Sequence, residues 1–318
     1  MHRTLMFVVV GVAFGASACG SDDDAAKPPP GSDPGVIETG VINTADGWVF
    51  RTEKFTLAPG EEHFVCYAAD APADLSIQRF AVAGKPMIHH FLMTTADGTR
   101  EPSGFSECGA AFKFSWRPIF MAGAGKAEVA MPDGAAQQVW AGTQLVLQLH
   151  LLNASAETVT EHAEVRMDRS PAADPNPVGQ FIFGTFDLAL PPKQPSRLQI
   201  DCTVNGDVQI FAMFPHMHYL GRKLELELGS NSDSLSPIYT RDPYAFEQQT
   251  IDPLELRITP GTAGRLTCSY DNNRDETITY GESTTNEMCF AIGFTVASGP
   301  AAGLGGGCFG KSLLLDNR

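Results

Sequence analysis

Apolar and polar residues alternate along short segments of this chain, and clusters of turn-forming residues separate the segments. From about residue 40 onward, long stretches with the 3.6-residue apolar spacing of an amphipathic helix are absent from the sequence. Short alternating runs bounded by Gly, Pro, Asn and Asp are typical of β-strands. The pattern therefore predicts an all-β fold.

One alternating segment, residues 143–153, combines a leucine face with a histidine. Successive side chains of a strand point to opposite sides of its sheet. The leucines at alternate positions would therefore fill a core, while His150 faces away from it together with Gln148.

A second segment, residues 207–218, alternates in the same way and ends in an H-x-H motif. Its apolar face is expected to continue in phase to His216 and His218. The apolar members of that face are Val208, Ile210, Ala212 and Phe214. Pro215 has no N–H to donate to a sheet, so we expect the strand to be an edge strand or to break there.

A proline-rich segment divides the chain of 318 residues. Residues 166–180 hold three prolines and few large apolar side chains, which indicates an interdomain linker. Each half has the size of one β-sandwich. We expect two antiparallel, jelly-roll-like β-sandwich domains, at 40–172 and 173–318.

The N-terminus has the features of an export signal. Leu5–Ala18 is an apolar stretch of 14 residues, too short to cross a bilayer, and small residues precede Cys19. Cys19 stands where bacterial lipoproteins carry an acylated cysteine, and an ordinary secretory signal cut at the same bond is the alternative. We expect a signal peptide at 1–18, an acidic Pro- and Gly-rich tether at 19–39, and an exported protein anchored by lipid in the bacterial cell envelope, at the periplasmic face or the outer membrane.

Charge and cysteine content narrow the partners and the compartment. A formal net charge of −15 argues against nucleic acid or an anionic membrane face as a partner. A small-molecule substrate remains, with membrane contact only through the lipid, and no protein partner can be inferred. If Cys19 carries lipid, six of the seven cysteines remain for three disulfides in an oxidising compartment, with free thiols as the alternative.

Five of the eight histidines fall into three tight placements: His89 beside His90, His150 alone, and His216 two residues before His218. Imidazole binds copper, zinc and iron. Two residues apart on a strand, a pair of histidines lies on one face about 7 Å apart. Adjacent histidines diverge on a regular strand, so joint ligation needs a bulge or a strand end. Structural core histidines are the alternative for each placement.

A methionine in NEMC could complete the second group. Met288 would add a thioether to two imidazoles, a combination that favours Cu(I). Met288 shares strand phase with Phe290 and Ile292, so an ordinary core position is the alternative. Cysteines committed to disulfides leave little room for a thiolate zinc site, and the chain has no H-E-x-x-H motif.

Several segments occur in an order that matches a known family. They are Cys66 followed by HHFL at 89–92, LQLH ending at 150, the cysteine at 202 leading into HMHYLG at 216–221, and GESTTNEMC at 281–289. From about Phe55 to Phe309 the chain resembles the copper type II, ascorbate-dependent monooxygenases, the family of peptidylglycine α-hydroxylating monooxygenase and dopamine β-monooxygenase. That resemblance implies two β-sandwich domains, one copper on each, across a copper-lined interdomain cleft.

The resemblance also implies the ligands and the disulfides. One copper would be held by His89, His90 and His150, and the other by His216, His218 and Met288. The implied disulfides are Cys66–Cys108, Cys202–Cys308 and Cys268–Cys289. In the family, ascorbate reduces both coppers, dioxygen reacts at the methionine-ligated copper, and the three-histidine copper supplies an electron. His216, His218 and Met288 are therefore the implied catalytic residues.

The chain departs from the peptide-amidating members of the family at the substrate site. Their Arg, Asn and Tyr beside the catalytic copper correspond to Phe214, Phe290 and Ile292 here. We therefore expect an apolar substrate pocket and hydroxylation of a C–H bond of a neutral or apolar small substrate. A non-catalytic exported copper-binding lipoprotein on the same scaffold is the alternative, and an interaction module with structural histidines is a third hypothesis.

Two further features receive structural interpretations. His162 in TEHAE is expected to be solvated. The glycine-rich run at 303–310 has no β-α context for phosphate binding and is interpreted as a flexible turn around Cys308.

Overall fold

A computed structural model describes residues 37–315 apart from 97, 109–112, 114, 124, 126, 282–284 and 297–304. The expected signal peptide, the lipid site at Cys19 and most of the tether lie outside the described residues. From Ile37 onward the chain forms one compact unit. Within the described ranges, no helix is long and apolar enough to cross a membrane.

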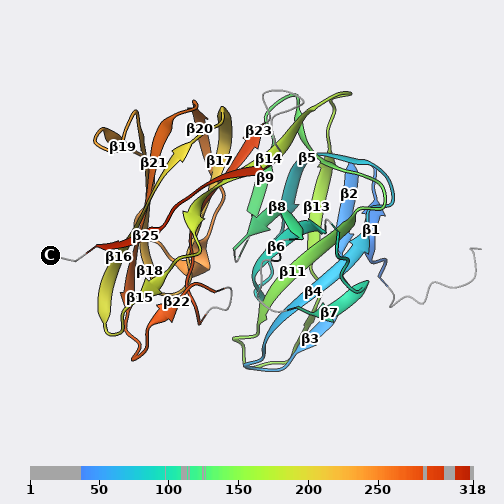
Figure 1. Ribbon diagram of the computed structural model, residues 1–318. Helices are drawn as coiled ribbons and strands as arrows, with labels where there is room; N and C mark the ends of the chain where they lie inside the picture. The colour runs from blue at the N-terminus through green and yellow to red at the C-terminus, as the bar shows by residue number, and fades with distance from the viewer. Residues whose placement is uncertain are drawn as a thin grey trace, which may run out of the picture. The chain divides into compact units, whose positions relative to one another are not determined.

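The prediction of an all-β, sandwich-like fold is confirmed (Figure 1). The described residues form strands and one short 3-10 helix, η1 (Phe246–Gln248). Of the strand pairs that the structure describes, β10–β14 and β14–β24 are parallel and the others antiparallel.

The N-terminal half places a five-stranded sheet, in the order β7-β4-β11-β6-β8, against part of a larger sheet, and both sheets contribute to one apolar core. The strands of the five-stranded sheet are β4 (Glu62–Asp70), β6 (Ile88–Ala96), β7 (Gly104–Glu107), β8 (Trp116–Ala122) and β11 (Gln144–Leu152). The strands of the larger sheet in this half are β1 (Gly40–Asn43), β2 (Gly47–Arg51), β5 (Leu75–Val82), β9 (Ala127–Ala130), β10 (Ala135–Val139) and β13 (Glu164–Arg169). A separate pair consists of β3 (Phe55–Leu57) and β12 (Val159–Glu161).

The C-terminal half repeats this arrangement around a second core. Its five-stranded sheet, in the order β19-β18-β21-β16-β25, consists of β16 (Gln194–Val204), β18 (Gly221–Gly229), β19 (Leu235–Arg241), β21 (Thr262–Asn272) and β25 (Ser312–Leu315). The larger sheet contributes β14 (Asn176–Thr185), β17 (Val208–His216), β20 (Asp252–Ile258), β23 (Cys289–Val296) and β24 (Gly305–Phe309). A separate pair consists of β15 (Ala189–Leu190) and β22 (Ile278–Thr279).

The larger sheet runs continuously from one half into the other. β10 and β14 pair in parallel, with Ala135 opposite Asn176. One face of β23 packs on the second core through Ala291, whereas its other face contributes Phe290 and Ile292 to the first core. The shared phase of Met288 with these two residues is therefore confirmed, because Met288 belongs to the first core as well.

The predicted linker is mostly strand. Of residues 166–180, only 170–175 lie between the end of β13 and the start of β14. Pro177 is tolerated near the start of β14 because the first residues of a strand need few N–H bonds. The expected boundary between 172 and 173 falls inside the short connection, and the division into two domains stays a prediction.

The predicted phase of β17 is wrong in its first half. A register shift between Ile210 and Ala212 places Ile210 in the second core, whereas Ala212 and Phe214 lie in the first. A bulge adds one residue to a strand and so reverses which side the following residues face. The expectation for Pro215 holds, because pairing with β20 ends at Met213 while pairing with β23 continues through His216.

The interpretation of the glycine-rich run as a turn is also wrong for its described part. Residues 305–309 form β24, which pairs in parallel with β14 and places Cys308 opposite Phe183. Residues 303 and 304 lie outside the described residues.

The three implied disulfides are present. Cys66–Cys108, Cys202–Cys308 and Cys268–Cys289 have Cα–Cα distances of 5.5, 5.5 and 6.0 Å.

On β16 and β21, the directly opposed Asp201 and Arg265 form a bidentate ion pair, with N–O distances of 2.6 and 2.8 Å.

Candidate metal centre

The first histidine group is assembled by a bulge at the end of β6. His90 lies directly opposite His150 on β11, and the register then shifts so that Leu151 pairs with Ile88. His89 is the extra residue of this bulge. Adjacent histidines need such a bulge, or a strand end, to bind one metal ion together. The ligand atoms of the three histidines lie within 4.8 Å of one another.

The contacts around His150 leave its Nδ1 facing the other imidazoles. Nε2 of His150 donates to Oε1 of Glu62 at 2.6 Å, and the ring stacks on Phe64 with a centroid distance of 4.3 Å. Nδ1 of His150 lies 3.4 Å from Nδ1 of His90. A carboxylate behind an imidazole fixes the tautomer and the ring orientation, as is common for metal-binding histidines.

His90 and His150 of the first group are held neutral by their surroundings. Burial lowers the pKa of His90 well below its usual value, and repulsion from His150 and His216 lowers it further. Burial also lowers the pKa of His150, although the hydrogen bond to Glu62 opposes this shift. Neutral imidazoles keep a lone pair for a metal ion.

The second histidine group lies at the end of β17. Nδ1 of His216 donates to Oε1 of Gln249 at 2.7 Å, and Nδ1 of His218 donates to the carbonyl oxygen of Asn286 at 3.0 Å. The two ring centroids are 5.2 Å apart. Because both Nδ1 atoms serve as donors, both Nε2 atoms are available as ligands. Burial lowers the pKa of His216, against the effect of the Gln249 bond, so this ring also stays neutral.

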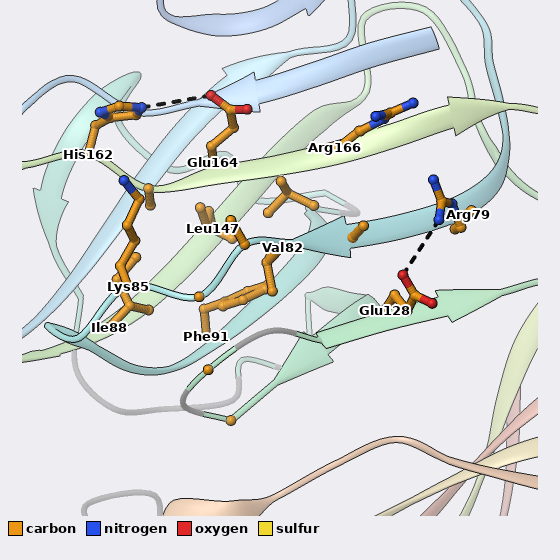
Figure 2. Close-up of a pocket in the computed structure, with 17 residues that line it drawn as sticks. Arg79, Val82, Lys85, Ile88, Phe91, Glu128, Leu147, His162, Glu164 and Arg166 are labelled. Atoms are coloured by element: carbon orange, nitrogen blue, oxygen red, sulfur yellow. Dashed lines mark hydrogen bonds and ion pairs between the residues drawn. The ribbon is translucent and has the colours of Figure 1, made fainter. Parts of the chain in front are cut away.

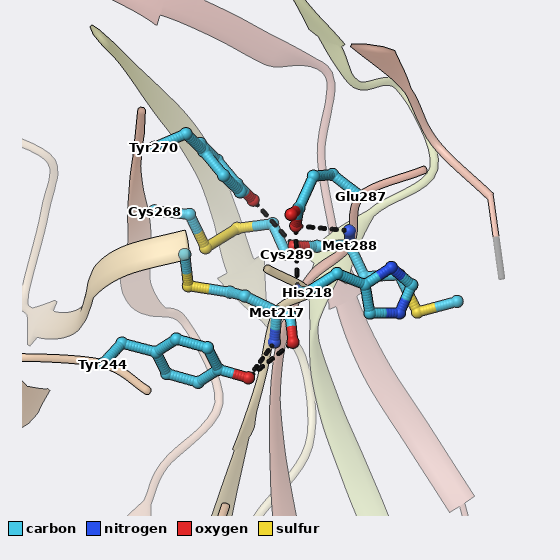
Figure 3. The surroundings of a disulfide bond; sticks show 8 residues. All are labelled: Met217, His218, Tyr244, Cys268, Tyr270, Glu287, Met288 and Cys289. Carbon is cyan, nitrogen blue, oxygen red and sulfur yellow. Dashed lines mark hydrogen bonds between the residues drawn. A yellow bond between two sulfur atoms is a disulfide. The ribbon is translucent and has the colours of Figure 1, made fainter. Parts of the chain in front are cut away.

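Met288 lines the same cavity as both of these histidines, and Figure 3 shows its thioether on the side of the His218 imidazole. Its backbone is fixed from two directions. The Tyr270 hydroxyl donates to the carbonyl oxygen of Met288 at 2.7 Å, and the next residue, Cys289, is disulfide-bonded to Cys268. The backbone from which the Met288 thioether extends is therefore fixed in position.

A buried carboxylate ties the methionine segment to the histidine segment. Glu287 is fully buried and accepts backbone N–H bonds from His218 at 2.8 Å and Met288 at 3.3 Å (Figure 3). It accepts a third backbone N–H bond from Leu220 at 2.7 Å. Burial raises its pKa to about 7, although these N–H bonds act in the opposite direction. No pattern in the sequence singled out Glu287, although this acidic residue directly precedes the candidate ligand Met288.

The Tyr244 hydroxyl holds the middle of the H-x-H motif. It accepts the N–H of Met217 at 2.9 Å and donates to the carbonyl oxygen of the same residue. Met217 and Tyr244 are both buried. No pattern in the sequence pointed to Tyr244 or to Gln249.

One aromatic ring lies between the two histidine groups. The centroid of Phe246, in η1, is 5.3 Å from that of His89, 5.6 Å from His90 and 5.8 Å from His218. Phe246 also packs on Tyr219 at 4.3 Å. The ring of Phe246 thus contacts both predicted histidine groups and lies between them.

A cavity adjoins both groups and is lined from both halves of the chain. His90 and Gln148 line it from the first half, and His216, His218 and Met288 from the second. All three residues of the expected substrate pocket line it too, namely Phe214, Phe290 and Ile292. Among the described residues that line it, none is Asp, Glu, Lys or Arg.

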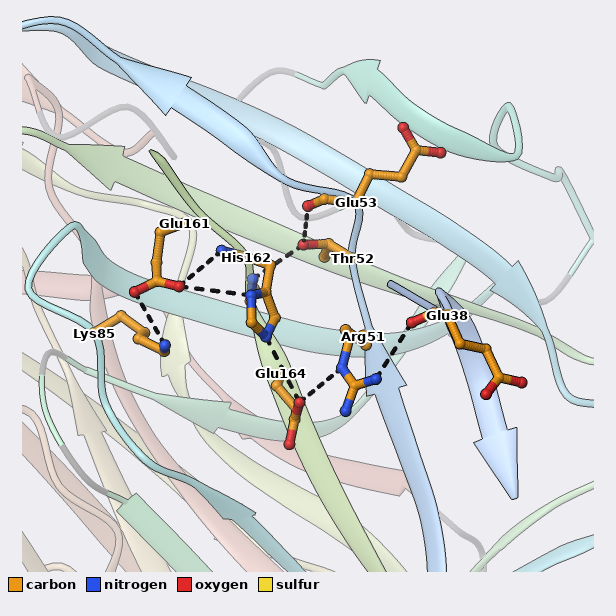
Figure 4. Close-up of polar contacts among 9 residues, drawn as sticks. Glu38, Arg51, Thr52, Glu53, Lys85, Glu161, His162 and Glu164 are labelled. Atoms are coloured by element: carbon orange, nitrogen blue, oxygen red, sulfur yellow. Dashed lines mark hydrogen bonds and ion pairs between the residues drawn. The ribbon is translucent and has the colours of Figure 1, made fainter. Parts of the chain in front are cut away.

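Another cavity, of about 400 Å³, lies in the N-terminal half and includes none of the predicted ligands (Figure 2). Charged groups on its rim are paired, Arg79 with Glu128 of the rim and Lys85 with Glu161 outside it. His162, which lines this cavity, is flanked by Glu161 and Glu164 at 3.5 and 3.7 Å (Figure 4). The expectation of a simply solvated His162 is therefore refined, because its ring is part of a network of charged groups.

The donor atoms of both groups fit copper. The first group offers three clustered imidazoles, and the second offers two Nε2 atoms beside a thioether. Imidazole and thioether donors suit copper, while the six described cysteines are tied up in disulfides and supply no thiolate. These residues are the ones that could hold the metal.

Comparisons with known proteins point in the same direction. Residues 179–292 match the family described as copper type II ascorbate-dependent monooxygenase, C-terminal domain. The human protein "Putative DBH-like monooxygenase protein 2" is 28% identical over 233 residues, which cover 65% of this chain and 46% of that protein. This chain thus spans less than half the length of that relative. The solved structure of infectious bursal disease virus Gt strain aligns over 87% of this chain and 78% of that chain at 12% identity, but its TM-score of 0.14 carries no argument.

The family match covers the H-x-H motif and Met288, and the human relative adds a second, independent similarity. Residues 179–292 are thus similar to the C-terminal domain of the copper type II ascorbate-dependent monooxygenases.

Proposed function

We propose that this protein is a copper- and ascorbate-dependent monooxygenase that binds two copper ions per chain and uses dioxygen to hydroxylate a C–H bond of a neutral or apolar small substrate. The observation that carries the proposal is the pairing of two unlike donor groups beside one cavity without charged lining residues. A protein that only stores copper would need neither two different donor sets nor an adjoining apolar cavity.

Each donor group has a distinct role in the proposal. His89, His90 and His150 would hold one copper, and His216, His218 and Met288 the other. Copper held in these groups would supply one-electron chemistry, with ascorbate as the reductant and dioxygen as the oxidant. A thioether is a weak, soft donor that suits the reduced metal.

The surrounding side chains position the donors and select the substrate. Gln249 and the Asn286 carbonyl set the tautomers of His216 and His218, so that each Nε2 points away from its hydrogen bond. Phe214, Phe290 and Ile292 form an apolar wall beside the second group. That wall excludes water and provides no partner for the carboxylate of a peptide substrate.

Metal analysis combined with oxygen uptake tests the proposal. The purified protein should bind two copper ions, and X-ray absorption of the reduced protein should detect one sulfur scatterer. Met288→Leu is a matched variant that keeps the apolar volume, and it should remove the sulfur signal and the activity while leaving copper on the three histidines.

Substrate-dependent oxygen uptake driven by ascorbate should appear with neutral apolar compounds. Copper binding without such uptake across a broad panel would leave a binding protein in place of the enzyme. Efficient turnover of a glycine-extended peptide would contradict the proposed substrate class.

A further inference from the structure

Four aromatic side chains from separate segments converge on the cavity beside Met288. We call Phe186, Tyr280, Phe290 and Phe309 the aromatic collar, and all four line the cavity. Phe186 is central, with ring centroids 5.1 Å from Tyr280 and 5.5 Å from both Phe290 and Phe309. Aromatic pairs at these separations stabilise one another beyond the area they bury, so the collar is a defined structure.

The collar runs from the buried wall of the cavity to solvent. Phe290 is 7% exposed, whereas Phe186 and Phe309 are 48% and 46% exposed and stack with an interplanar angle of 21°. Neither of these two stacked, half-exposed phenylalanines is a member of the two clusters of buried core residues. An exposed apolar pair on a cavity that leads to the donor groups is typical of a ligand-contact surface.

Glycines make room for two of these rings. A Cβ atom at Gly184 would lie 2.0 Å from the ring of Phe290, its cross-strand neighbour, and one at Gly307 would lie 2.1 Å from the ring of Phe309. Any side chain at either position would displace a collar ring. Gly184 in β14 therefore makes room for the Phe290 ring, and Gly307 in β24 makes room for the Phe309 ring.

The polar atoms of the cavity are neutral. Besides the histidines, the polar lining consists of Gln148, Gln249 and Tyr280. Moving an ammonium or carboxylate group from water into a site without an opposite charge costs several kcal/mol. A neutral hydroxyl or carbonyl could be accommodated by amide and phenol groups at much lower cost.

We propose that the aromatic collar is the entrance and the selectivity element of this cavity, and that it accepts an uncharged substrate carrying a planar aromatic ring. The ring would stack on the exposed faces of Phe186 and Phe309 and then pack against Phe290, which directs the remainder of the substrate toward Met288. The inference rests on the proposed function for its role in turnover, but the binding step requires neither copper nor ascorbate.

Binding to the metal-free full-length protein tests the collar. The probes are benzyl alcohol, its charged analogues benzylamine and benzoate, and the non-planar cyclohexylmethanol, measured by ligand-detected NMR titration at neutral pH. We expect benzyl alcohol to bind at least about ten-fold more tightly than either charged analogue and several-fold more tightly than cyclohexylmethanol. Equal or tighter binding of a charged analogue would overturn the inference.

Variants separate the collar from general hydrophobicity. Phe186→Leu and Phe309→Leu keep an apolar side chain but lose the planar ring, so each should weaken benzyl alcohol binding by about five-fold or more. Trp140→Leu removes an aromatic residue that is 62% exposed and does not line the cavity, and it should leave binding unchanged. Unchanged binding in both phenylalanine variants would also overturn the inference.

The two proposals fail in different ways. If selective binding is present but the copper-loaded protein shows no ascorbate-driven turnover, the collar is supported and the monooxygenase proposal is lost. If turnover is present but insensitive to the collar variants and to substrate charge, the monooxygenase proposal stands and the collar inference is lost.

Discussion

Replacing the Tyr244 hydroxyl tests how the second donor group is held. Tyr244→Phe preserves the ring and removes only the oxygen that contacts Met217, the residue between His216 and His218. Because Tyr244 is 5% exposed and Met217 is fully buried, water does not replace the lost contacts easily. Both the N–H and the carbonyl group of Met217 would lose this partner.

The expected cost follows from the number of contacts. One neutral hydrogen bond contributes about 1–1.5 kcal/mol, so the loss of two should lower the free energy of unfolding by about 2–3 kcal/mol. Loosening Met217 also lets the spacing of the two flanking imidazoles vary. Loss of a contact that orients metal ligands typically weakens metal binding by about 10–100-fold.

Two measurements check these values. Urea unfolding of the metal-free protein gives the stability change, and titration against a copper chelator gives the affinity of each site. Tyr270→Phe is a matched control, since it removes a single bond, to the Met288 carbonyl, and should cost about half as much. The three-histidine site should keep its affinity, because the Tyr244 hydroxyl contacts the backbone of Met217 in the second group.

The reasoning would be refuted by a Tyr244→Phe variant as stable as the parent, or by equal losses of copper affinity at both sites. Equal losses would show that the two groups do not bind as separate units.

Three further outcomes are expected. Gln249→Leu should weaken copper binding at the second group by about ten-fold, because His216 loses the acceptor that fixes its tautomer, and Gln249→Glu, which keeps an acceptor, should restore most of it in the same chelator titration. Removing the Cys66–Cys108 disulfide by double alanine substitution should lower stability by about 4 kcal/mol for a sequence separation of 42 residues, measured by thermal unfolding under oxidising conditions, and a loss below about 1 kcal/mol would contradict this. Asp201→Asn should cost up to about 1 kcal/mol at neutral pH. Hydrogen bonds from the cross-strand Arg265 hold the pKa of Asp201 below its ordinary value. The stability difference between Asp201→Asn and the parent should therefore persist above the ordinary pKa and vanish as pH falls through the lowered pKa. Urea unfolding at a series of pH values measures this difference, and a difference that grows in acid would contradict the expectation.

Local patterns in the sequence predicted the strand class and singled out the candidate donor residues, whose role as copper ligands stays a prediction. Alternation along residues 143–153 placed His150 opposite its leucines, and the structure has the same arrangement. The need for a bulge at the adjacent histidines could be stated in advance, because two neighbouring side chains of a strand diverge. Its location at His89 follows from pairing with β11, which no local pattern contains.

Features that depend on distant pairing could not be predicted. The bulge in β17 lies in a stretch where Ile210, Phe211 and Ala212 are all apolar. Alternation alone could therefore not show that Ile210 and Ala212 face different cores. Glu287 was missed because a carboxylate that accepts backbone N–H bonds looks the same in sequence as a solvated one. The glycines before Cys308 were misjudged because their role depends on where the rings of Phe181 and Phe309 lie.

The wall of the cavity belongs to the first apolar core, since Phe214, Phe290 and Ile292 are members of both. A change that reshapes this wall must also repack the centre of the fold, at a typical cost of several kcal/mol for a large-to-small substitution. Phe186 and Phe309 are not members of either core cluster, so substituting them does not require the core to repack. Variation among related chains, or in a directed-evolution experiment, should therefore alter chemical preference first at these two outer positions, with the inner surface following only when compensating mutations accompany it.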